Sequence, residues 1–427
     1  MLKKKNLTGL LSAATMTLLA GCGSTPLPPD TGCGVPGGFC APATPVTRAT
    51  PAEPAYTPPP QSDTGVRTSP VEAPPSADGS MPAASSTPSG PAVRVALLLP
   101  LESQALAQPA EALRAGFMAA YERERGGITV NLVPTGDSSQ AALDAYRRAA
   151  EQNDIVVGPL ARPAVAALAT SGAVTKPTVA LNHPQTGGAL PRQMLVIGLS
   201  LEDEARQVAD WAAAEQAAGR ALVVTGRATW QQRISGAFSA RWSGLGRQHS
   251  TVELPISDGY VDGNALAELR RQLQADPPQL MFAALDAGQL RQVRSSLGTS
   301  LPTYATATAN PGRDAASVPQ ELVGVRVLDL PWTVQADHSA VMQYPRPGAA
   351  GDSLDLQRLY ALGIVAYRVA RQLALQPDGN FELDGVTGRL SVDMGGAAPR
   401  FQRVESGAVV QDSASGDGRV FLPVLGQ

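Results

Sequence analysis

Cys22 is the residue whose surroundings best predict a chemical modification. It ends the run Leu19-Ala20-Gly21-Cys22, which follows three lysines at positions 3–5 and an apolar stretch at residues 7–20. A basic start, an apolar stretch too short to cross a bilayer and small residues before a cleavage point are typical of a secretory signal peptide. A cysteine directly after that point accepts diacylglycerol in bacterial lipoproteins, and the new amino terminus is then acylated. We therefore expect a signal peptide at residues 1–21 and a lipid anchor on Cys22; an ordinary signal peptide with a chance cysteine is the alternative.

The residue after Cys22 predicts which membrane the anchor enters. Lipoproteins kept in the inner membrane usually carry aspartate at this position, whereas this chain has Gly23. Several acyl chains on one residue also hold a protein to a membrane far more firmly than a single chain does. We therefore expect a protein anchored in the outer membrane, on its periplasmic side.

The other cysteines and the histidines form no recognisable catalytic or metal-binding pattern. Cys33 and Cys40 could close a small disulfide loop in the oxidising periplasm, and no histidine lies near them. His183, His249 and His338 lack metal-ligand spacing to another histidine, a cysteine or a pair of carboxylates. A nucleophile elbow, a phosphate-binding loop and a dinucleotide fingerprint are also missing from the sequence. We predict no catalytic residue, no metal, no cofactor and no enzyme activity.

Glu202, Asp203 and Glu204 are consecutive acids at the expected start of a helix. They could be paired catalytic carboxylates, but acids in a first turn ordinarily complement the helix dipole. We interpret them as residues that stabilise the helix.

The net charge argues against nucleic acid as a partner. The 427-residue chain has a formal charge of −3, and removal of the three signal-peptide lysines changes this to −6. A mildly acidic protein without a basic block lacks the electrostatic footprint of a nucleic-acid-binding protein.

Residues 22–92 differ in composition from the rest of the chain and predict a disordered tether. Of the 37 prolines, 17 lie between residues 23 and 92. Runs such as Pro58-Pro59-Pro60 favour extended polyproline II, and no apolar period is present. About 70 such residues would span on the order of 200 Å fully extended and ~50–150 Å as an ensemble. This reach would carry a folded domain through the peptidoglycan, which is a further candidate partner.

An alternation of strand and helix patterns begins at residue 93 and predicts an α/β fold. The apolar run 93–99 is typical of a strand buried on both faces, whereas 109–123 has apolar residues at helical spacing. Repeated strand–helix units form a parallel sheet covered by helices. The expected strands of this first half are 93–99, 128–133, 154–157, 178–181 and 194–199, and the expected helices are 109–123, 139–152 and 162–171.

The alternation restarts after an expected helix at residues 202–218, which predicts a second lobe. We expect one two-lobed domain at residues 93–412, each lobe being a mostly parallel sheet flanked by helices, and a C-terminal tail at 413–427. Lobe 1 is expected to comprise about residues 93–200 and 302–335, and lobe 2 about 201–301 and 350–412. The further expected strands are 221–225, 251–255, 279–284, 302–308 and 325–330, and the further expected helices are 230–245, 264–274, 288–297 and 355–373.

Several ordered motifs resemble a known family. VALLLPL at 95–101, IVVGPL at 155–160 and VALN at 179–182 are similar to type I periplasmic binding proteins. Three further motifs resemble the LppC/LpoA family more specifically: GLSLEDEAR at 198–206, YALGIVAY at 360–367 and DGVTGRLS at 384–391. The resemblance covers about residues 93–412 and implies a two-lobed type I periplasmic binding protein-like fold. It also implies an outer-membrane lipoprotein that activates a class A penicillin-binding protein.

Two departures from the family pattern accompany the resemblance. Enteric members carry a helical, repeat-type domain ahead of the binding-protein-like domain, whereas the proline-rich tether occupies that place here. The family commonly has aspartate where this chain has Val365. Because the binding-protein-like domain is the part implied to contact the synthase, we expect binding to persist, with the tether replacing the reach of the missing domain.

The resemblance also implies a cleft between the lobes. Its contacts would come from loops after the first strands of lobe 1, with exposed amides at Gly158 and Leu160 suited to a carboxylate, and from Trp230 on a helix of lobe 2. The alternative is that Gly158-Pro159 only shapes a tight strand-to-helix turn and that Trp230 packs in the core. The candidate cleft residues are Glu102, Ser103, Gly158, Pro159, Leu160, Asn182, His183 and Trp230.

Trp332 is a separate candidate for contact with a partner. It lies in Leu330-Pro331-Trp332, and aromatic residues dominate the energetics of interfaces. The alternative is that its side chain fills the hinge.

Two functions remain open. One is a regulatory protein that docks on a class A penicillin-binding protein and stimulates peptidoglycan synthesis. The other is a solute-binding receptor that serves an inner-membrane transporter with an amino acid or a peptide fragment. Tethering to the outer membrane favours the first, because delivery to a transporter needs docking at the opposite membrane.

Overall fold

The computed structural model describes residues 92–185, 188–216, 219–312, 318–347, 353–377, 379–396, 398–412 and 420–424. The expected signal peptide, Cys22, Cys33, Cys40 and nearly all of the expected tether lie outside these residues and stay predictions. Each helix among these residues is too short or too polar to span a bilayer.

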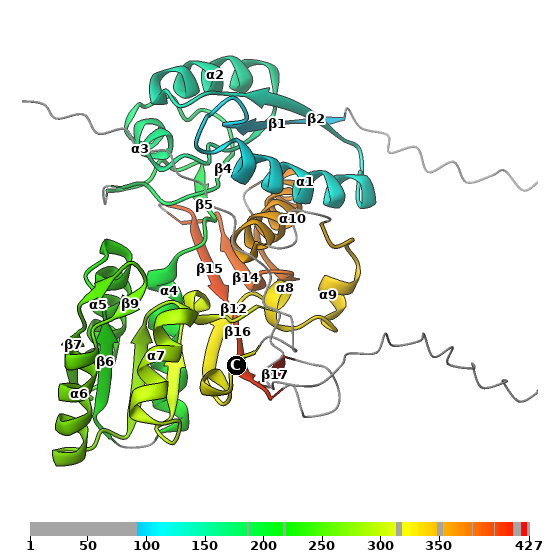
Figure 1. Ribbon diagram of the computed structural model, residues 1–427. Helices are drawn as coiled ribbons and strands as arrows, with labels where there is room; N and C mark the ends of the chain where they lie inside the picture. Colours follow the sequence, from blue (N-terminus) through cyan, green and yellow to red (C-terminus); the bar gives the residue numbers. More distant parts are fainter. Residues whose placement is uncertain are drawn as a thin grey trace, which may run out of the picture. The chain divides into compact units, whose positions relative to one another are not determined.

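The first lobe is built on a five-stranded parallel sheet. Its elements are β1 (Val93–Leu99), α1 (Ala107–Arg123), β2 (Ile128–Pro134), α2 (Ser139–Gln152), β3 (Ile155–Val157), α3 (Arg162–Thr170), β4 (Thr178–Ala180), β5 (Met194–Val196) and α10 (Leu354–Leu375). The strand order is β2-β1-β3-β4-β5 (Figure 1). In β1, Leu97 packs with α1 and α10 on one face, whereas Leu98 packs with α2 and α3 on the other. A strand covered on both faces is apolar throughout, which explains the run at 93–99.

Two glycines let α1 and α10 approach closely. A Cβ atom on Gly116 would lie 1.9 Å from the carbonyl oxygen of Tyr360, and one on Gly363 would lie 2.0 Å from that of Leu113. Any larger residue would overlap the backbone of the neighbouring helix. This contact holds α10, which comes late in the chain, against the first lobe.

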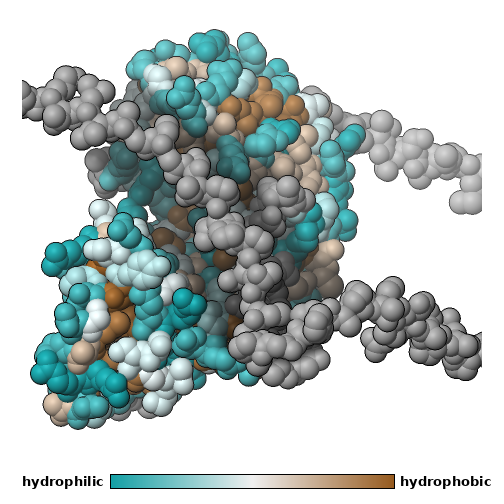
Figure 2. Space-filling model, in the orientation of Figure 1, coloured by the Kyte–Doolittle hydropathy of each residue, from teal (hydrophilic) through white to brown (hydrophobic). Residues whose placement is uncertain are grey.

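The second lobe is built on a seven-stranded sheet. Its elements are α4 (Leu201–Glu215), β6 (Ala221–Thr225), α5 (Thr229–Gly244), β7 (His249–Glu253), β8 (Ile256–Ser257), β9 (Tyr260–Val261), α6 (Gly263–Ala275), β10 (Leu280–Ala284), α7 (Ala287–Leu297), β11 (Thr303–Ala305), η1 (Ala307–Ala309), η3 (Gln320–Leu322), β12 (Arg326–Asp329), β16 (Ser406–Val410) and β17 (Phe421–Pro423). The strand order is β17-β16-β12-β11-β10-β6-β7, with β16 and β17 antiparallel to their neighbours. Apolar residues of α4 and α5 cover one face, and those of α6 and α7 cover the other. Figure 2 shows mainly hydrophilic side chains over α2 and α6, as expected for outer helices.

A small antiparallel sheet belongs with the first lobe. It comprises β13 (Asn380–Gly385), β14 (Gly388–Asp393) and β15 (Arg400–Val404). Leu383, Leu390 and Val392 are buried in the same core as β1 and α10. Two short helices, α8 (Pro331–Val334) and α9 (Ser339–Met342), also contribute to this core.

Three described segments cross between the lobes. The first connects β5 to α4 through residues 197–200, the second connects β12 to α8 through Leu330, and the third connects β15 to β16 through Glu405. We call the region formed by these three crossings the lobe junction.

The structure confirms parallel sheets flanked by helices and corrects how the later segments divide between the lobes. Residues 302–335 are expected in lobe 1, but β11 and β12 extend the second sheet in parallel from β10. Residues 350–412 are expected in lobe 2, but α10 and β13–β15 pack on the first-lobe core, and β16 joins the second sheet. The expected tail at 413–427 contributes β17, because Phe421 is buried in the second-lobe core. Local periodicity predicts an element, whereas the sheet or core that it joins depends on its tertiary contacts.

Candidate functional site at the lobe junction

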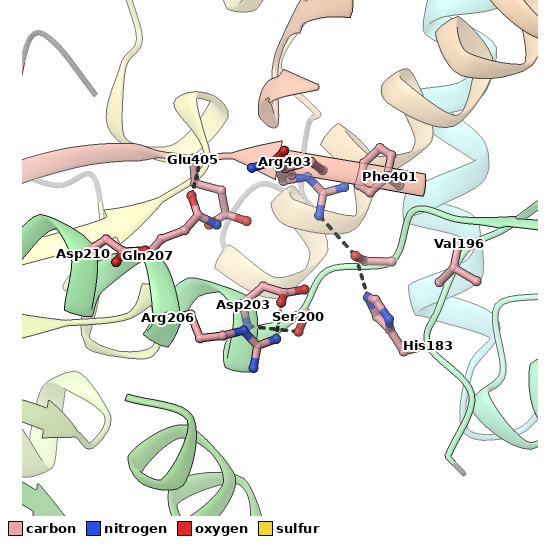
Figure 3. A pocket seen from close by; sticks show the side chains of 12 residues that line it. His183, Val196, Ser200, Asp203, Arg206, Gln207, Asp210, Phe401, Arg403 and Glu405 are labelled. Atoms are coloured by element: carbon pink, nitrogen blue, oxygen red, sulfur yellow. Dashed lines mark hydrogen bonds and ion pairs between the residues drawn. The ribbon is translucent and has the colours of Figure 1, made fainter. Parts of the chain in front are cut away.

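A polar cavity of about 210 Å³ lies at the lobe junction, between β5, α4 and β15 (Figure 3). A second hollow of about 390 Å³ adjoins it. Charged side chains on these walls are largely paired, such as Asp203 with Arg206, and Glu202 with Arg233 at 3.1 Å. The walls therefore offer hydrogen-bonding groups with little net charge. The residues that line both hollows are His183, Ser200, Asp203 and Arg206.

Asn182 and His183 are the predicted cleft residues that the structure places at these hollows. His183 Nε2 lies 3.2 Å from the carbonyl oxygen of Gly198, and the His183 amide donates to Asn182 Oδ1 at 2.9 Å. Asn182 Nδ2 donates to the carbonyl oxygen of Leu160 at 3.2 Å. Both side chains therefore shape the wall through hydrogen bonds within the protein.

The Gly158-Pro159-Leu160 turn has a structural role. Gly158 has φ +120°, and a Cβ atom there would lie 2.1 Å from the carbonyl oxygen of Leu98. Its amide donates to the carbonyl oxygen of Val179 at 2.8 Å, while Pro159 and Leu160 are buried. The Gly158 amide is engaged in the sheet, so the expectation that it is exposed to a carboxylate is wrong. The alternative, a tight strand-to-helix connection, agrees with this geometry.

Glu102 and Ser103 do not line either hollow. Ser103 is 2% exposed, and its hydroxyl group bonds to the carboxylate of Asp137. The same hydroxyl oxygen accepts from the amide of Leu106 at 2.8 Å at the start of α1. Glu102 is exposed to solvent. Ser103 therefore holds a loop and a helix start together.

Trp230 and Trp332 both pack within their lobes. Trp230, in the first turn of α5, is half-buried against the second-lobe core and lines neither hollow. Trp332 is fully buried in the first-lobe core, with the Arg346 guanidinium 4.0 Å from its ring centre. The prediction that Trp332 contacts a partner is wrong, because none of its surface is exposed. The alternative, that it fills the interior beside a crossing, agrees with its packing.

Arg403 and Glu405 are junction residues that sequence reasoning missed. Arg403 donates to the carbonyl oxygens of Ile197 at 2.7 Å and Gly198 at 3.1 Å, which joins β15 to the first crossing. The Glu405 amide donates to Gln207 Oε1 at 3.0 Å, which joins the third crossing to α4. Burial lowers the pKa of Arg403. Figure 3 shows these side chains projecting toward the cavity between β15 and α4.

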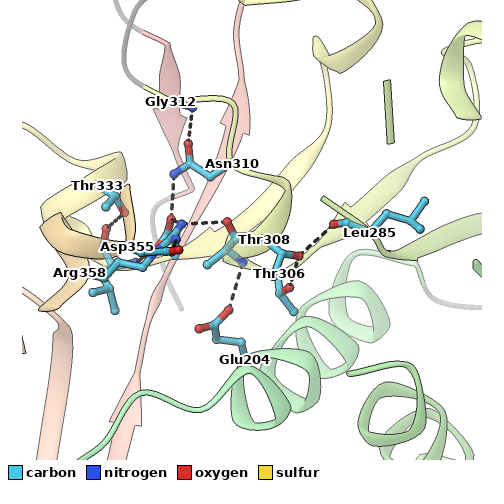
Figure 4. Close-up of polar contacts among 12 residues, drawn as sticks. Glu204, Leu285, Thr306, Thr308, Asn310, Gly312, Thr333, Asp355 and Arg358 are labelled. Carbon is cyan, nitrogen blue, oxygen red and sulfur yellow. Dashed lines mark hydrogen bonds and ion pairs between the residues drawn. The ribbon is translucent and has the colours of Figure 1, made fainter. Parts of the chain in front are cut away.

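Arg358 connects α10 to the second lobe. Its guanidinium bonds to both carboxylate oxygens of Asp329, at 2.7 and 3.1 Å, and to the carbonyl oxygen of Ala307 at 2.8 Å. Burial lowers the pKa of Arg358, but the charge and hydrogen bonds of Asp329 outweigh this and raise the pKa above its ordinary value. On the other side, the Ala307 amide donates to Glu204 Oε2 at 3.0 Å (Figure 4). The backbone of Ala307 is therefore bound at its carbonyl oxygen by Arg358 and at its amide by Glu204.

One sequence signal could have identified Glu204. It lies on the buried face of α4 with Val208 and Trp211, at the spacing of a helical stripe. The prediction considered only its place in an acidic first turn. Arg403 and Glu405 carry no comparable signal, because their partners lie about two hundred positions away in the sequence.

The described residues form no group of three or more histidine, cysteine, aspartate or glutamate side chains that could hold a metal ion. The junction instead contains hydrogen-bond donors and acceptors whose partners belong mostly to the protein. Its chemistry is that of a contact between lobes.

Comparison with known sequences identifies the family. A family model described as "LppC putative lipoprotein" matches residues 88–400. The penicillin-binding protein activator LpoA of Photobacterium profundum is 26% identical over 334 residues, covering 70% of this chain and 53% of that protein. LpoA of Haemophilus ducreyi is 25% identical over 305 residues, covering 70% and 50%. The chain thus spans about half the length of these curated relatives.

Solved structures share the fold. The C-domain of LpoA from Haemophilus influenzae, described as a regulator of PBP1A, has a TM-score of 0.61 at 23% identity and covers 78% of this chain and 100% of that domain. A "putative branched-chain amino acid ABC transporter" from Chromobacterium violaceum has a TM-score of 0.62 at 33% identity and covers 74% of this chain and 99% of that one. The expected periplasmic binding protein-like fold is confirmed. Because the family model matches most of its length, this chain belongs to the LppC lipoprotein family.

Proposed function

We propose that this chain is an outer-membrane lipoprotein, anchored through Cys22, that binds and activates a class A penicillin-binding protein. The observation that carries the proposal is that relatives named penicillin-binding protein activator align with 70% of the chain. The LpoA C-domain, described as a regulator, supports a docking role because its whole length superposes on the two-lobed part. Binding is proposed to stimulate peptidoglycan synthesis by that enzyme. Peptidoglycan itself is a second candidate partner.

The proposed role is regulatory rather than catalytic. The curated relatives are named activators. The side chains expected to hold a solute are also engaged inside the protein, as Ser103 is with Asp137 and Leu106. These observations favour the activator over the solute receptor.

The tether has a defined part in this proposal. A flexible link converts binding to a partner into an event at high local concentration, provided that the link spans the gap. Replacing residues 41–91 by about a dozen residues would leave about 31 of the 70 residues at positions 23–92, so the fully extended reach would fall to about half. We expect loss of function in cells with unchanged binding in solution; full cellular activity of the shortened chain would refute this part.

The decisive experiment measures glycan polymerisation by the class A penicillin-binding protein of the same species. The full chain is added at micromolar concentration, and binding is followed in parallel by surface plasmon resonance. We expect binding and a severalfold faster rate. Binding without stimulation would reduce the role to recruitment, and lack of binding would refute the proposal.

A further inference from the structure

Each of the three crossings between the lobes brings one carboxylate to the lobe junction. Glu204 lies in the first turn of α4 after the first crossing, Asp329 ends β12 before the second, and Glu405 forms the third. Their exposed fractions are 3%, 0% and 4%. Carboxylates are almost never buried to this extent unless they are paired. The hydrogen bonds and ion pairs of each carboxylate therefore need to be examined in turn.

Asp329 is fully compensated. Besides its two bonds to Arg358, it accepts from Asn310 Nδ2 at 2.8 Å and from the amide of Leu330 at 2.7 Å. An arginine and two further donors together satisfy the hydrogen-bonding capacity of this buried carboxylate. Asp329 and Arg358 thus neutralise each other at the second crossing.

Glu204 and Glu405 lack such compensation. Glu204 accepts from the Ala307 amide, and Glu405 Oε2 is buried without a hydrogen-bond partner among the described residues. Arg403 is the neighbouring cation, but its terminal guanidinium nitrogens donate to backbone carbonyls of the first crossing. Arg358 is already paired with Asp329, so Arg403 is the cation left to compensate the two glutamates. Its hydrogen bonds go to backbone carbonyl oxygens and not to either glutamate. The charged groups that act on the pair are Asp203 of α4, Asp329 of β12, Arg358 of α10 and Arg403 of β15. Along the cavity wall, His183 and, from α4, Arg206 and Asp210 face the same space.

We propose that Glu204 and Glu405 form a proton-operated lock of the lobe junction, in which a retained proton keeps the lobes in the orientation seen here and its loss opens the junction to water. Two ionised carboxylates in one buried site repel each other and each lacks the solvation that water would provide. Glu405 lines the cavity of about 210 Å³, so a small separation of β15 from α4 would hydrate the pair. The opening moves the lobes because Glu405 lies on the third crossing and Glu204 lies in the helix that directly follows the first.

The protonation behaviour agrees with this geometry. Burial is the main factor that raises the pKa of Glu405, to about 8. Burial, followed by the charge of Glu405, raises the pKa of Glu204 well above its ordinary value. The last proton of the pair is therefore lost above neutral pH.

The test measures the separation of the lobes on the protein alone. In the full chain with Cys22, Cys33 and Cys40 replaced by serine, spin labels are attached through Glu151→Cys on α2 and Gln274→Cys on α6, both exposed positions. We expect the distance distribution from double electron–electron resonance to shift to longer values between pH 6 and pH 9.5, with a midpoint near pH 8 and an unchanged far-ultraviolet circular dichroism spectrum.

Two separate variants remove the lock without changing shape. Glu405→Gln and Glu204→Gln each leave one carboxylate of the pair beside the compensated Asp329, and each is expected to diminish the pH-dependent shift. Glu382→Gln, an exposed acid on β13, is the matched control and should retain it. An unchanged distribution in the parent chain, or an undiminished shift in both junction variants, would overturn the proposal. Because no partner is present, failure here leaves the proposed activator function to its own experiment.

Discussion

The contact between α1 and α10 and the lobe junction both join segments that are far apart in the sequence, but they do so by opposite means. At the helix contact, Gly116 and Gly363 remove side chains so that two backbones touch. At the junction, Arg358, Arg403 and the buried acids make the connection through charge and hydrogen bonds.

The helix contact stabilises the fold at any pH, whereas the lobe junction can respond to a change in pH. Close apolar packing depends on volume and is insensitive to pH. A buried charged contact stabilises the fold only while each group keeps its ionic partner or its proton. Removing either one turns the contact into a destabilising one. We expect the helix contact to tolerate no added atom and the junction to tolerate no lost partner.

Arg358→Met should have the largest effect. It leaves the fully buried Asp329 without its cation, which typically costs about 3–5 kcal/mol in the free energy of unfolding. Urea denaturation followed by circular dichroism measures this cost. Arg114→Met, which breaks an exposed pair with Glu111, is the control and should change stability by less than about 1 kcal/mol. Equal effects of the two variants would contradict a charged junction.

Gly363→Ala should come next. The added Cβ atom would meet the Leu113 carbonyl oxygen at 2.0 Å, so α10 must move away from α1 at a cost of about 2–3 kcal/mol. Gly236→Ala in α5 has open space around it and should instead stabilise the protein by about 0.5–1 kcal/mol. The same denaturation experiment compares the two. A neutral Gly363→Ala would show that the helix contact is not tight.

The pH dependence of stability should follow from Glu405. Its pKa is raised in the folded state, to about 8 from 4.5, so the unfolded chain releases this proton at lower pH than the folded protein does. Stability should therefore fall as pH rises from about 4.5 to about 8 and then level off. Urea titrations at several pH values test this, and Glu405→Gln should flatten the curve. The raised pKa of Glu405 would be contradicted if the stability of the parent chain rose between pH 4.5 and pH 8 while that of Glu405→Gln did not.

His183→Ala should have the smallest effect. It removes one hydrogen bond to the Gly198 carbonyl oxygen at the cavity wall, for which a cost of about 1 kcal/mol is typical. Thermal unfolding at pH 7 measures the change. The Gly198 carbonyl also accepts from Arg403, so a loss as large as that of Arg358→Met would place His183 in the charged junction itself.

Particular elements show how far sequence reasoning reaches. The helix expected at 139–152 agrees with α2, because Ser138 caps its start and its apolar residues share one face. The helix expected at 355–373 agrees with α10 to within two residues, yet it is expected in the wrong lobe. The sequence prediction omits β13–β17 and the short helices α8 and α9. β13 and β14 alternate exposed and buried residues, so they lack the continuous apolar runs by which the buried parallel strands are predicted.

The candidate site shows the same division. Asn182 and His183 were found because loops after parallel strands gather at one edge of a sheet. Glu102, Ser103 and the Gly158 turn follow the same rule but are not at the cavity, since neighbouring side chains decide which loop ends are open.

Residues close together in the chain suffice to predict the parallel sheets, the helices that cover them and the lipid anchor at Cys22, and they also form the family motifs. Contacts between distant segments place α10 in the first lobe and β11 and β12 in the second, and they bring Glu204, Glu405 and Arg403 together at the junction. Whether a charged residue is solvated or buried depends on the segments that cover it, and these come from parts of the chain some two hundred residues apart.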